Sequence, residues 1–305
     1  MQMDLIRIAT RESKLALWQA EFVKNELLRH YPTMQVELVK MTTKGDRWLN
    51  APLSEVGGKG LFIKELEAAM LDGRADIAVH SMKDLPAQLP PGFVLPVIAF
   101  RAALNDVLIS QFGQLENLPQ KARVGSSSLR RKAQLLHRRA DLEILPIRGN
   151  VGTRLDKLAQ GEFDAIVLAQ AGLQRLGIKF EPQQILPLEL SLPAPGQAAL
   201  GVECLEENTA VQNLLAPLND PVVHACVSAE RGVSLAFGAD CSLPIAALAQ
   251  AVDGEIFLQA RIASADGRKI LASEAKGESP TTLAQEVSET LIKAGANDIL
   301  AALRD

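Results

Sequence analysis

The stretch Arg74-Ala-Asp-Ile-Ala-Val-His-Ser-Met-Lys-Asp-Leu-Pro86 decides the fold class of this chain. Residues 77–79 form an apolar run of the kind found in strands that are covered on both faces, and a proline ends any ladder soon after it. Lys83 and Asp84 therefore follow the carboxyl end of a buried strand, where open α/β sheets bind their ligands. Both are candidate site residues. The alternative is a strand that ends in a solvated charged turn.

The pattern around this strand occurs twice in the chain. Residues 73–80, Gly-Arg-Ala-Asp-Ile-Ala-Val-His, match residues 161–168, Gly-Glu-Phe-Asp-Ala-Ile-Val-Leu. A strand, a hydroxyl-bearing turn and a helix start precede both, first at residues 7–13 and again at residues 123–131. Because strands that alternate with helices form largely parallel sheets, two similar α/β domains in tandem are predicted.

After residue 221 the pattern changes. Residues 255–263 and 269–275 flank Asp266-Gly267, a strong hairpin signal, and residues 281–303 have the apolar spacing of one amphipathic helix. We expect a third, smaller α+β domain there. The predicted domains are residues 1–98 with 198–218, residues 99–197, and residues 219–305, since the apolar residues after Gln197 look like a return to the first domain.

The bulk composition excludes several classes of protein. The chain has 305 residues, of which 48% are hydrophobic and 22% charged, as in ordinary globular proteins with two or three domains. It shows no signal-peptide pattern at its start and no apolar run of about 18 residues, which predicts a cytoplasmic, non-membrane protein. The net charge of -4 argues against nucleic acid as a partner, and no His or Cys spacing indicates a metal.

Hydroxyl residues follow the first strand of each predicted domain. A helix start after such residues directs free backbone N–H groups and the positive helix end outward, which favours an anion. In the second domain Ser126, Ser127 and Ser128 precede Arg130 and Arg131. Helix capping is the alternative explanation, but a cap needs only one hydroxyl, so we favour an anion site.

Cys241 is the one cysteine in a loop-like context. Its neighbours in Phe237-Gly-Ala-Asp-Cys-Ser-Leu-Pro244 are mostly small or polar, whereas cysteines are more often buried as small hydrophobes. An accessible lone thiol is a candidate nucleophile, and a buried structural thiol is the alternative.

These segments together resemble the porphobilinogen deaminase (hydroxymethylbilane synthase) family, over essentially the whole chain. The resemblance rests on the motifs Arg-Ile-Ala-Thr-Arg-x-Ser at 7–13, Val-Gly-Gly-Lys-Gly-Leu-Phe at 56–62, His-Ser-Met-Lys-Asp-x-Pro at 80–86, Val-Gly-Ser-Ser-Ser-Leu-Arg-Arg at 124–131, Arg-Gly-Asn-Val-Gly-Thr-Arg at 148–154, Ala-Gly-Leu-x-Arg-Leu at 171–176 and Cys-Ser-Leu-Pro-Ile at 241–245. It implies a transferase that condenses four porphobilinogen molecules, with loss of ammonia, into a linear tetrapyrrole. It also implies two periplasmic-binding-protein-like domains with a cleft between them, a smaller C-terminal α+β domain and a monomer.

The resemblance further implies a dipyrromethane cofactor, bound by a thioether to Cys241. Each pyrrole ring carries an acetate and a propionate, so a growing chain needs many cations, hydroxyls and helix N-termini around it. Lys59 and Phe62 resemble residues of the family's lid. The implied binding positions are Arg11, Ser13, Lys59, Phe62, Ser81, Ser126, Ser127, Ser128, Arg130, Arg131, Arg148, Gly149, Arg154, Arg175 and Gln197.

Asp84 and Lys83 match the family's catalytic motif. Loss of ammonia from porphobilinogen leaves an electrophilic azafulvene, and positive charge develops on pyrrole nitrogens when the bound chain attacks it. One carboxylate placed there, Asp84 by resemblance, could hold the N–H groups, stabilise the cation and transfer protons.

Two positions depart from the family pattern. Ala239-Asp240 stands where Gly-Gly often precedes the cofactor cysteine, and Glu55 stands where some members carry Lys. The first change puts side chains and a negative charge beside Cys241 but leaves the thiol. The second removes a basic role from that part of the lid.

Two other functions fit part of this pattern. A two-lobed binding protein for a small anion would share the domains and the cations but leaves Cys241 and the third domain without a role. A cysteine hydrolase would need a histidine partner, and no histidine of the chain lies in an obvious catalytic context.

Overall fold

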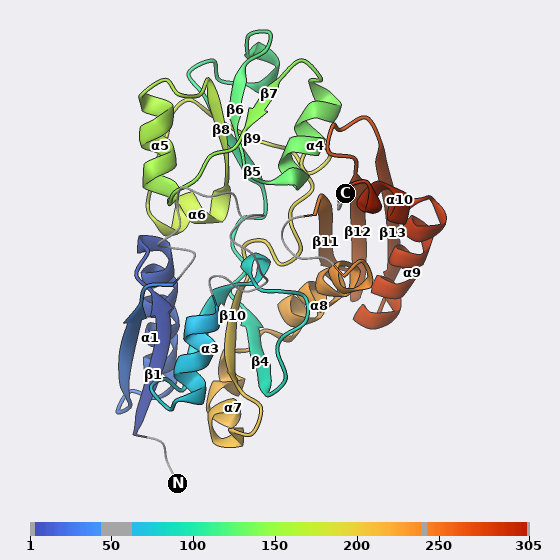
Figure 1. The fold of residues 1–305 in the computed structure, drawn as a ribbon. Helices are drawn as coiled ribbons and strands as arrows, with labels where there is room; N and C mark the ends of the chain where they lie inside the picture. Colours follow the sequence, from blue (N-terminus) through green and yellow to red (C-terminus); the bar gives the residue numbers. More distant parts are fainter. Residues whose placement is uncertain (1–3, 44–62, 239–242, 304–305) are drawn as a thin grey trace. The chain divides into compact units, whose positions relative to one another are not determined.

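The computed structural model describes residues 4–43, 63–238 and 243–303 (Figure 1). The chain divides into two compact units. Unit 1 comprises residues 1–101 and 199–224, and unit 2 comprises residues 102–198 and 225–305.

Unit 1 is a five-stranded sheet with helices on both faces. Parallel strands β1, β2 and β3 are joined by β10 and β4 in the order β2-β1-β3-β10-β4, and β10 runs antiparallel to both of its neighbours. Helices α1 and α7 pack on one face and α3 on the other. The elements are β1 (Leu5–Arg11), α1 (Lys14–His30), β2 (Gln35–Met41), α3 (Lys64–Leu71), β3 (Ile77–Ser81), the 3-10 turn η1 (Met82–Asp84), β4 (Phe93–Ala99), β10 (Leu200–Leu205), α7 (Thr209–Leu215) and the 3-10 turn η3 (Ala216–Leu218).

Unit 2 builds a second sheet of the same design. Its order is β7-β6-β8-β5-β9, with β6 parallel to β7 and β8, and with β5 antiparallel to β8 and β9. The predicted repeat of two α/β domains is therefore confirmed. The elements are β5 (Asp106–Ile109), the 3-10 turn η2 (Leu115–Asn117), β6 (Arg123–Gly125), α4 (Leu129–Arg138), β7 (Glu143–Leu145), α5 (Val151–Ala159), β8 (Ala165–Ala169), α6 (Gln170–Arg175) and β9 (Gln183–Ile185).

One arginine–aspartate clasp is repeated at the same place in both sheets. The backbone N–H and the guanidinium of Arg7 donate to Asp76 at 2.8 to 3.1 Å, and Arg7 also donates to the carbonyl of Gly73 at 2.7 Å. Arg123 makes the same set of bonds to Asp164, at 2.7 to 3.2 Å. The clasp joins the first strand to the segment entering the third strand, so the matching sequence motifs encode a matching local structure.

The C-terminal elements of unit 2 form a three-stranded antiparallel sheet with helices packed on it (Figure 1). The predicted hairpin is confirmed, because the second and third strands pair across the Asp266-Gly267 turn. The elements are α8 (Pro221–Ala236), β11 (Ile245–Val252), β12 (Glu255–Ala263), β13 (Ile270–Gly277), α9 (Pro280–Lys293) and α10 (Ala296–Ala301).

The prediction of one continuous helix over residues 281–303 is wrong. The last helical stretch is two helices, because Gly295 adopts φ +95° between them and a left-handed residue ends an α-helix. The apolar spacing continues across the break because Leu291, Ile299 and Leu300 all reach the same core.

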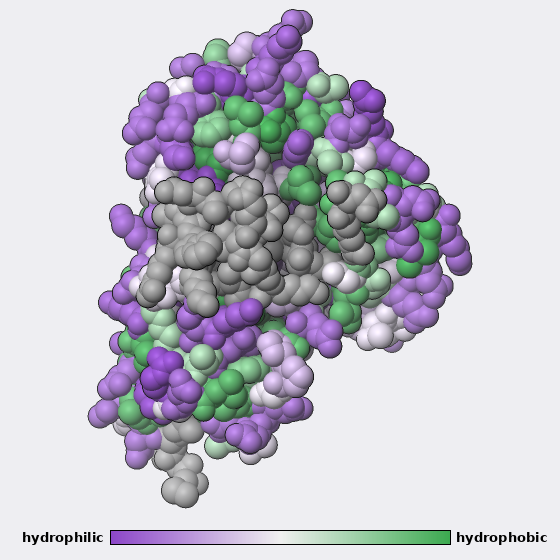
Figure 2. Space-filling model, viewed as in Figure 1, coloured by the Kyte–Doolittle hydropathy of each residue, from purple (hydrophilic) through white to green (hydrophobic). Residues whose placement is uncertain are grey.

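In the described ranges, no helix combines the length and the apolar character needed to cross a membrane. Among the coloured residues of the face drawn in Figure 2, most are hydrophilic, with smaller apolar areas between them.

Candidate functional site

The predicted site residues of unit 1 lie where its parallel strands end. Strand β1 ends at Arg11, and Ser13 then caps helix α1 by accepting the N–H of Ala16 at 3.3 Å. Strand β3 ends at Ser81, whose Oγ accepts a hydrogen bond from Gln19 Nε2 of α1 at 2.8 Å. Because β1 and β3 are parallel neighbours, their carboxyl ends meet at one edge of the sheet.

Lys83 and Asp84 lie in the turn η1, directly after β3. The side chain of Met82, the first residue of the turn, is buried and packs over Gly201 on the neighbouring strand, where any Cβ would collide with its sulfur. Its N–H donates to the carbonyl of Ala199 at 3.1 Å. Met82 therefore holds the turn against the sheet, while Asp84 is exposed and Lys83 is partly buried.

The three serines of unit 2 have roles in the local backbone. Ser128 caps α4 by accepting the N–H of Arg131 at 3.4 Å, and Ser126 accepts the N–H of Ser128 at 3.3 Å. Ser127 donates to the carbonyl of Ile147 at 2.7 Å and accepts its N–H at 3.0 Å. The serines thus join the end of β6 to the segment that comes after β7.

Arg130 and Arg131 converge on a buried carboxylate that the motifs do not reveal. Asp106, fully buried at the start of β5, accepts bonds from Arg130 at 2.8 Å and from Arg131 at 2.7 Å. Ser191 donates to it at 2.9 Å and Gln197 at 3.2 Å. Burial alone would raise the pKa of Asp106, but the charges and hydrogen bonds of the two arginines outweigh burial and hold that pKa well below its usual range.

We expect Asp106→Asn to lower the unfolding temperature strongly at pH 7. The change leaves Arg130 and Arg131 buried beside each other without their carboxylate, and breaking a buried ion pair costs about 3 to 5 kcal/mol. Because the pKa of Asp106 is lower in the folded protein than in the unfolded chain, its ionised carboxylate stabilises the folded state at pH values above the unfolded pKa of about 3.9. This stabilisation decreases as the pH falls below about 3.9 toward the folded pKa. The difference between parent and variant should therefore shrink on going from pH 7 toward pH 3.

Thermal unfolding across that pH range checks this prediction. Glu116→Gln is the matched control, because its ion pair with Arg138 is exposed on both sides and should matter little. Equal unfolding temperatures for the parent and Asp106→Asn at pH 7 would contradict the role given to Asp106.

The remaining predicted residues of unit 2 lie near the same strand ends. Arg148 and Gly149 come after β7, and Arg154 Nε, in the first turn of α5, donates to the carbonyl of Gly149 at 2.8 Å. Arg175, at the end of α6, donates to the carbonyl of Ala198 at 2.6 Å, and burial lowers its pKa to about 10. The side chain of Arg148 is partly exposed.

Three predicted residues, Lys59, Phe62 and Cys241, lie outside the described residues. The structure brings together Arg11, Ser13, Ser81, Lys83 and Asp84 at one edge of unit 1. In unit 2 it gathers the predicted residues around the ends of β6, β7 and β8, namely Ser126, Ser127, Ser128, Arg130, Arg131, Arg148, Gly149, Arg154, Arg175 and Gln197.

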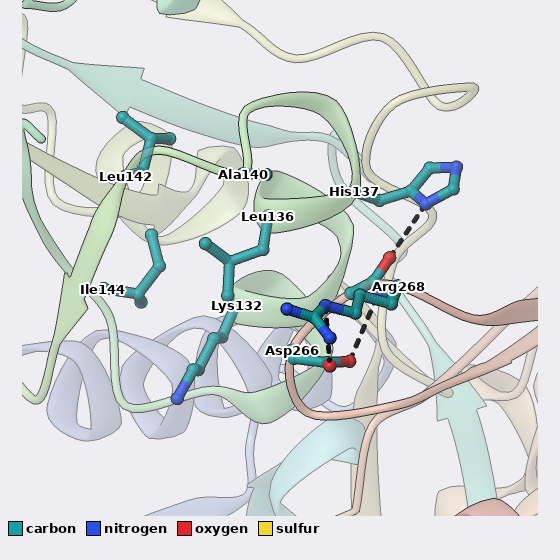
Figure 3. A pocket seen from close by; sticks show the side chains of 9 residues that line it. Lys132, Leu136, His137, Ala140, Leu142, Ile144, Asp266 and Arg268 are labelled. Atoms are coloured by element: carbon teal, nitrogen blue, oxygen red, sulfur yellow. Dashed lines mark hydrogen bonds and ion pairs between the residues drawn. The ribbon is translucent and has the colours of Figure 1, made fainter. Parts of the chain in front are cut away.

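A surface pocket of about 560 Å³ lies elsewhere in unit 2, between α4 and the turn that joins β12 to β13 (Figure 3). Its walls include Leu136, Leu142 and Ile144, and the imidazole of His137 contacts the carbonyl of Gly267 at 2.9 Å. None of the predicted site residues lines this pocket.

Three buried carboxylates, Asp106, Glu203 and Glu230, were missed by the sequence motifs. Asp106 opens an apolar strand, and Glu203 interrupts the apolar run Leu200–Leu205. Glu230 of α8 accepts the N–H groups of Gly196 and Ala249, both at 2.7 Å, and so holds the segment that carries Gln197. A charged residue inside an otherwise apolar strand was the signal available, since such residues are rarely buried without partners.

Fold and strand ends together define a class: an α/β protein built from two repeated sheets, each of which carries cations and helix N-termini at its strand ends, groups suited to an acidic ligand. Similarity to known proteins identifies the member of that class. A family model described as "Porphobilinogen deaminase, dipyromethane cofactor binding domain" matches residues 6–213, and "Porphobilinogen deaminase, C-terminal domain" matches residues 224–293. The porphobilinogen deaminase of Thiobacillus denitrificans (strain ATCC 25259 / T1) is 49% identical over 304 residues, covering 99% of each chain. The chain belongs to the porphobilinogen deaminase family.

The solved structures that match this chain have much lower sequence identities. The periplasmic aliphatic sulphonate binding protein SsuA from Escherichia coli has a TM-score of 0.40 and 14% identity, over 77% of this chain and 70% of that chain. The probable amino-acid ABC transporter extracellular-binding protein ytmK from Bacillus subtilis has a TM-score of 0.42 and 13% identity, over 71% and 90%.

Membership in the family establishes the activity and the cofactor. The chain is a transferase of tetrapyrrole biosynthesis, a hydroxymethylbilane synthase that condenses four porphobilinogen molecules with release of ammonia, and it uses a dipyrromethane cofactor. The residues present fit that cofactor's carboxylates. Arg131 is almost fully buried, yet its Nε–H has no acceptor among the described residues, and a carboxylate is the acceptor that a guanidinium prefers.

Proposed function

We propose that Asp84 and Lys83 are the residues of this chain that act on the reacting pyrroles. One observation carries the proposal: Asp84 is an exposed carboxylate on a turn whose base is anchored, at the carboxyl end of a buried strand. A carboxylate held there can accept pyrrole N–H bonds and stabilise positive charge without reorganising during the reaction.

Asp84 then serves two steps in turn. As the substrate loses ammonia, the carboxylate of Asp84 stabilises the cation that forms. After the new carbon–carbon bond forms, the same carboxylate takes up the proton lost from the attacking ring. Lys83, beside it, contributes a positive charge for the carboxylates of the incoming substrate. The bound dipyrromethane supplies the terminal pyrrole ring from which the chain grows.

We propose that the cofactor is attached through Cys241. Cys204 and Cys226 are both buried, and burial, together with the charge of Glu203, raises the pKa of the Cys204 thiol to about 11. Neither supplies the accessible thiolate that a thioether linkage needs. Cys241 matches the family's attachment motif and lies in a segment of mostly small and polar residues.

The carboxylates of cofactor, substrate and growing chain are assigned to the cations, hydroxyls and backbone groups at the strand ends. The described residues among them are Arg11, Ser13, Ser81, Ser126, Ser127, Ser128, Arg130, Arg131, Arg148, Gly149, Arg154, Arg175 and Gln197. Lys59 and Phe62, which lie outside the described residues, are added on the family resemblance alone. The orphan Nε–H of Arg131 and the partly exposed guanidinium of Arg148 support this assignment most directly.

The proposal extends to organisation and setting. We place domain boundaries at residues 1–98 with 198–218, 99–197 and 219–305, so that the C-terminal sheet is a third domain carrying Cys241. The enzyme acts as a cytoplasmic monomer. Intact mass tests the covalent attachment: the purified chain should exceed its sequence mass by two linked pyrrole units. Turnover of porphobilinogen without that excess would count against it.

We expect Arg148→Leu to weaken cofactor assembly or substrate binding by about 1.5 to 3 kcal/mol, the value of a charge-assisted hydrogen bond, with little change in unfolding temperature. Arg131→Leu should weaken this binding and also lower the unfolding temperature, because the Arg131 guanidinium compensates the charge of buried Asp106. Cofactor content by mass, KM and thermal unfolding measure these effects. Normal loading and normal kinetics in both variants would make these residues structural or surface charges.

A further inference from the structure

Unit 1 holds three buried ionisable side chains that the proposed chemistry does not use. His80 on β3 is 6% exposed, Glu203 on β10 is 0% exposed and Glu67 on α3 is 8% exposed. Nε2 of His80 lies 2.9 Å from Oε2 of Glu203. The strands pair so that Gly201 is opposite His80 and Glu203 is opposite Ala78, which makes the histidine and the glutamate diagonal neighbours on the face that α3 covers.

Burying these three ionisable side chains, His80, Glu203 and Glu67, together costs electrostatic free energy. Burial raises the pKa of Glu67, and so does the charge of Glu203, while His80 and Lys64 act in the opposite direction. One carboxylate oxygen of each glutamate, Oε1, is buried without a hydrogen-bond partner among the described residues. A buried ionic group of this kind is weak evidence for stability, because well-packed apolar residues often serve as well.

Unit 2 shows that the fold does not need this cluster. When Gly161 and Asp164 are matched to Gly73 and Asp76, the counterparts of His80 and Glu67 are Leu168 and Leu155. Strand β5 pairs with β8 as β10 pairs with β3, so the counterpart of Glu203 is Ile109, which lies opposite Ile166. The repeated sheet therefore builds the same three positions from apolar side chains in one core cluster.

The two units differ at the carboxyl end of this strand. In unit 1, β3 leads into the turn that carries Lys83 and Asp84, whereas in unit 2, β8 leads directly into α6. The turn is tied to β10 by the bond from the Met82 N–H to Ala199 and by the packing of Met82 on Gly201, the residue opposite His80. The His80–Glu203 pair bridges the same two strands immediately before the turn.

We propose that His80 and Glu203 are positioning residues for Asp84, with Glu67 on the helix that covers them. The His80–Glu203 bond fixes the end of β3 against β10, and so sets where the turn holds its carboxylate relative to the reacting pyrroles. The inference rests on the proposed role of Asp84 and adds to it residues that touch no substrate. A displacement of about 1 Å at a reacting group can cost two orders of magnitude in rate, so such bracing has kinetic consequences.

The test is the triple variant His80→Leu/Glu203→Ile/Glu67→Leu, which gives unit 1 the three apolar residues that unit 2 has at the matching positions. The protein is supplied with preformed hydroxymethylbilane and its cofactor content is checked by intact mass. We expect an unfolding temperature at or above that of the parent and a KM within about twofold, with kcat lower by tenfold or more. A kcat within about twofold of the parent, or an effect confined to KM, would overturn the proposal.

A matched control removes the clasp at the other end of the same strand. Arg7→Leu/Asp76→Leu should alter stability but leave the kcat of the folded enzyme unchanged. If the triple variant does not fold, the double variant His80→Leu/Glu203→Ile decides, because it removes the bond between β3 and β10 and leaves Glu67 in place. Parental kcat in this double variant would then overturn the proposal, and a reduced kcat at unchanged KM would support it.

Combination with Asp84→Asn separates this inference from the proposed function. If the cluster acts through Asp84, the triple change should cost much less kcat in the Asp84→Asn background than in the parent. The same cost in both backgrounds would overturn positioning of Asp84. Full turnover by Asp84→Asn alone would instead refute the proposed catalytic role, which is a separate result.

Discussion

Cys241→Ser should give a folded chain that lacks the added mass of two pyrrole units and does not turn over porphobilinogen. The hydroxyl of serine is far less acidic than a thiol and a much poorer nucleophile, so the thioether cannot be replaced by an ether under the same conditions. Without the attached primer, chain growth has no starting ring. We expect loss of activity to the detection limit, measured as hydroxymethylbilane formed per mole of enzyme.

The matched control for this variant is Cys226→Ala. Cys226 is 4% exposed in the C-terminal core, so its replacement should cost some stability but keep the full added mass and the turnover. The added mass, mapped by peptide digestion, should lie on the peptide that contains residue 241. Retention of the added mass in Cys241→Ser, or its mapping to Cys204 or Cys226, would refute the assignment.

Asp84→Asn should lower kcat at least about 100-fold while the unfolding temperature changes little. The amide keeps the size and one acceptor of the carboxylate but removes the charge that stabilises the cation and the base that takes up the proton, and each such role typically contributes about 100-fold or more. Asp84 is exposed, and its turn is held by Met82 rather than by the carboxylate, so folding should not depend on it.

Because the cofactor is assembled by the same kind of chemistry, Asp84→Asn must be supplied with preformed hydroxymethylbilane and its loading measured by mass. Asp72→Asn is a suitable control, since Asp72 is an exposed acid at the end of α3 in a surface ion pair with Arg74. A loaded, folded Asp84→Asn enzyme working within a few-fold of the parent would show that Asp84 is only the polar end of a strand.

The arginines of unit 2 show how far a motif can be interpreted without a structure. The run of serines before Arg130 and Arg131 correctly indicates a capped helix that begins at a strand end. The same run does not reveal that both guanidinium groups contact Asp106, which lies 24 and 25 residues earlier in the chain. These arginines have a structural role in addition to the proposed binding role, and their variants must be judged on stability as well as on loading.

The internal repeat determined more than the motifs did. The matching stretches around Asp76 and Asp164 predicted two sheets of one design, and the structure confirms the match down to the individual bonds of the clasp. Alternation of apolar runs with polar turns is a local property of the sequence, so strands, helix caps and the hairpin at Asp266-Gly267 could be predicted from it. The break at Gly295 was also local in origin, but the continuous apolar spacing concealed it.

By itself, the sequence determined the two repeated α/β sheets, the family of the enzyme and the positions of the described candidate residues near strand ends, because each depends on neighbours a few residues apart. Only the tertiary structure decided which charges are buried and with what partner. His80 and Glu203 meet across 123 residues because β10 inserts antiparallel beside β3, and nothing near either residue encodes that pairing. The order of strands in the sheet brings ionisable groups together that are far apart in the sequence. Their burial then determines the free-energy cost of keeping them charged and the functional role that they can have.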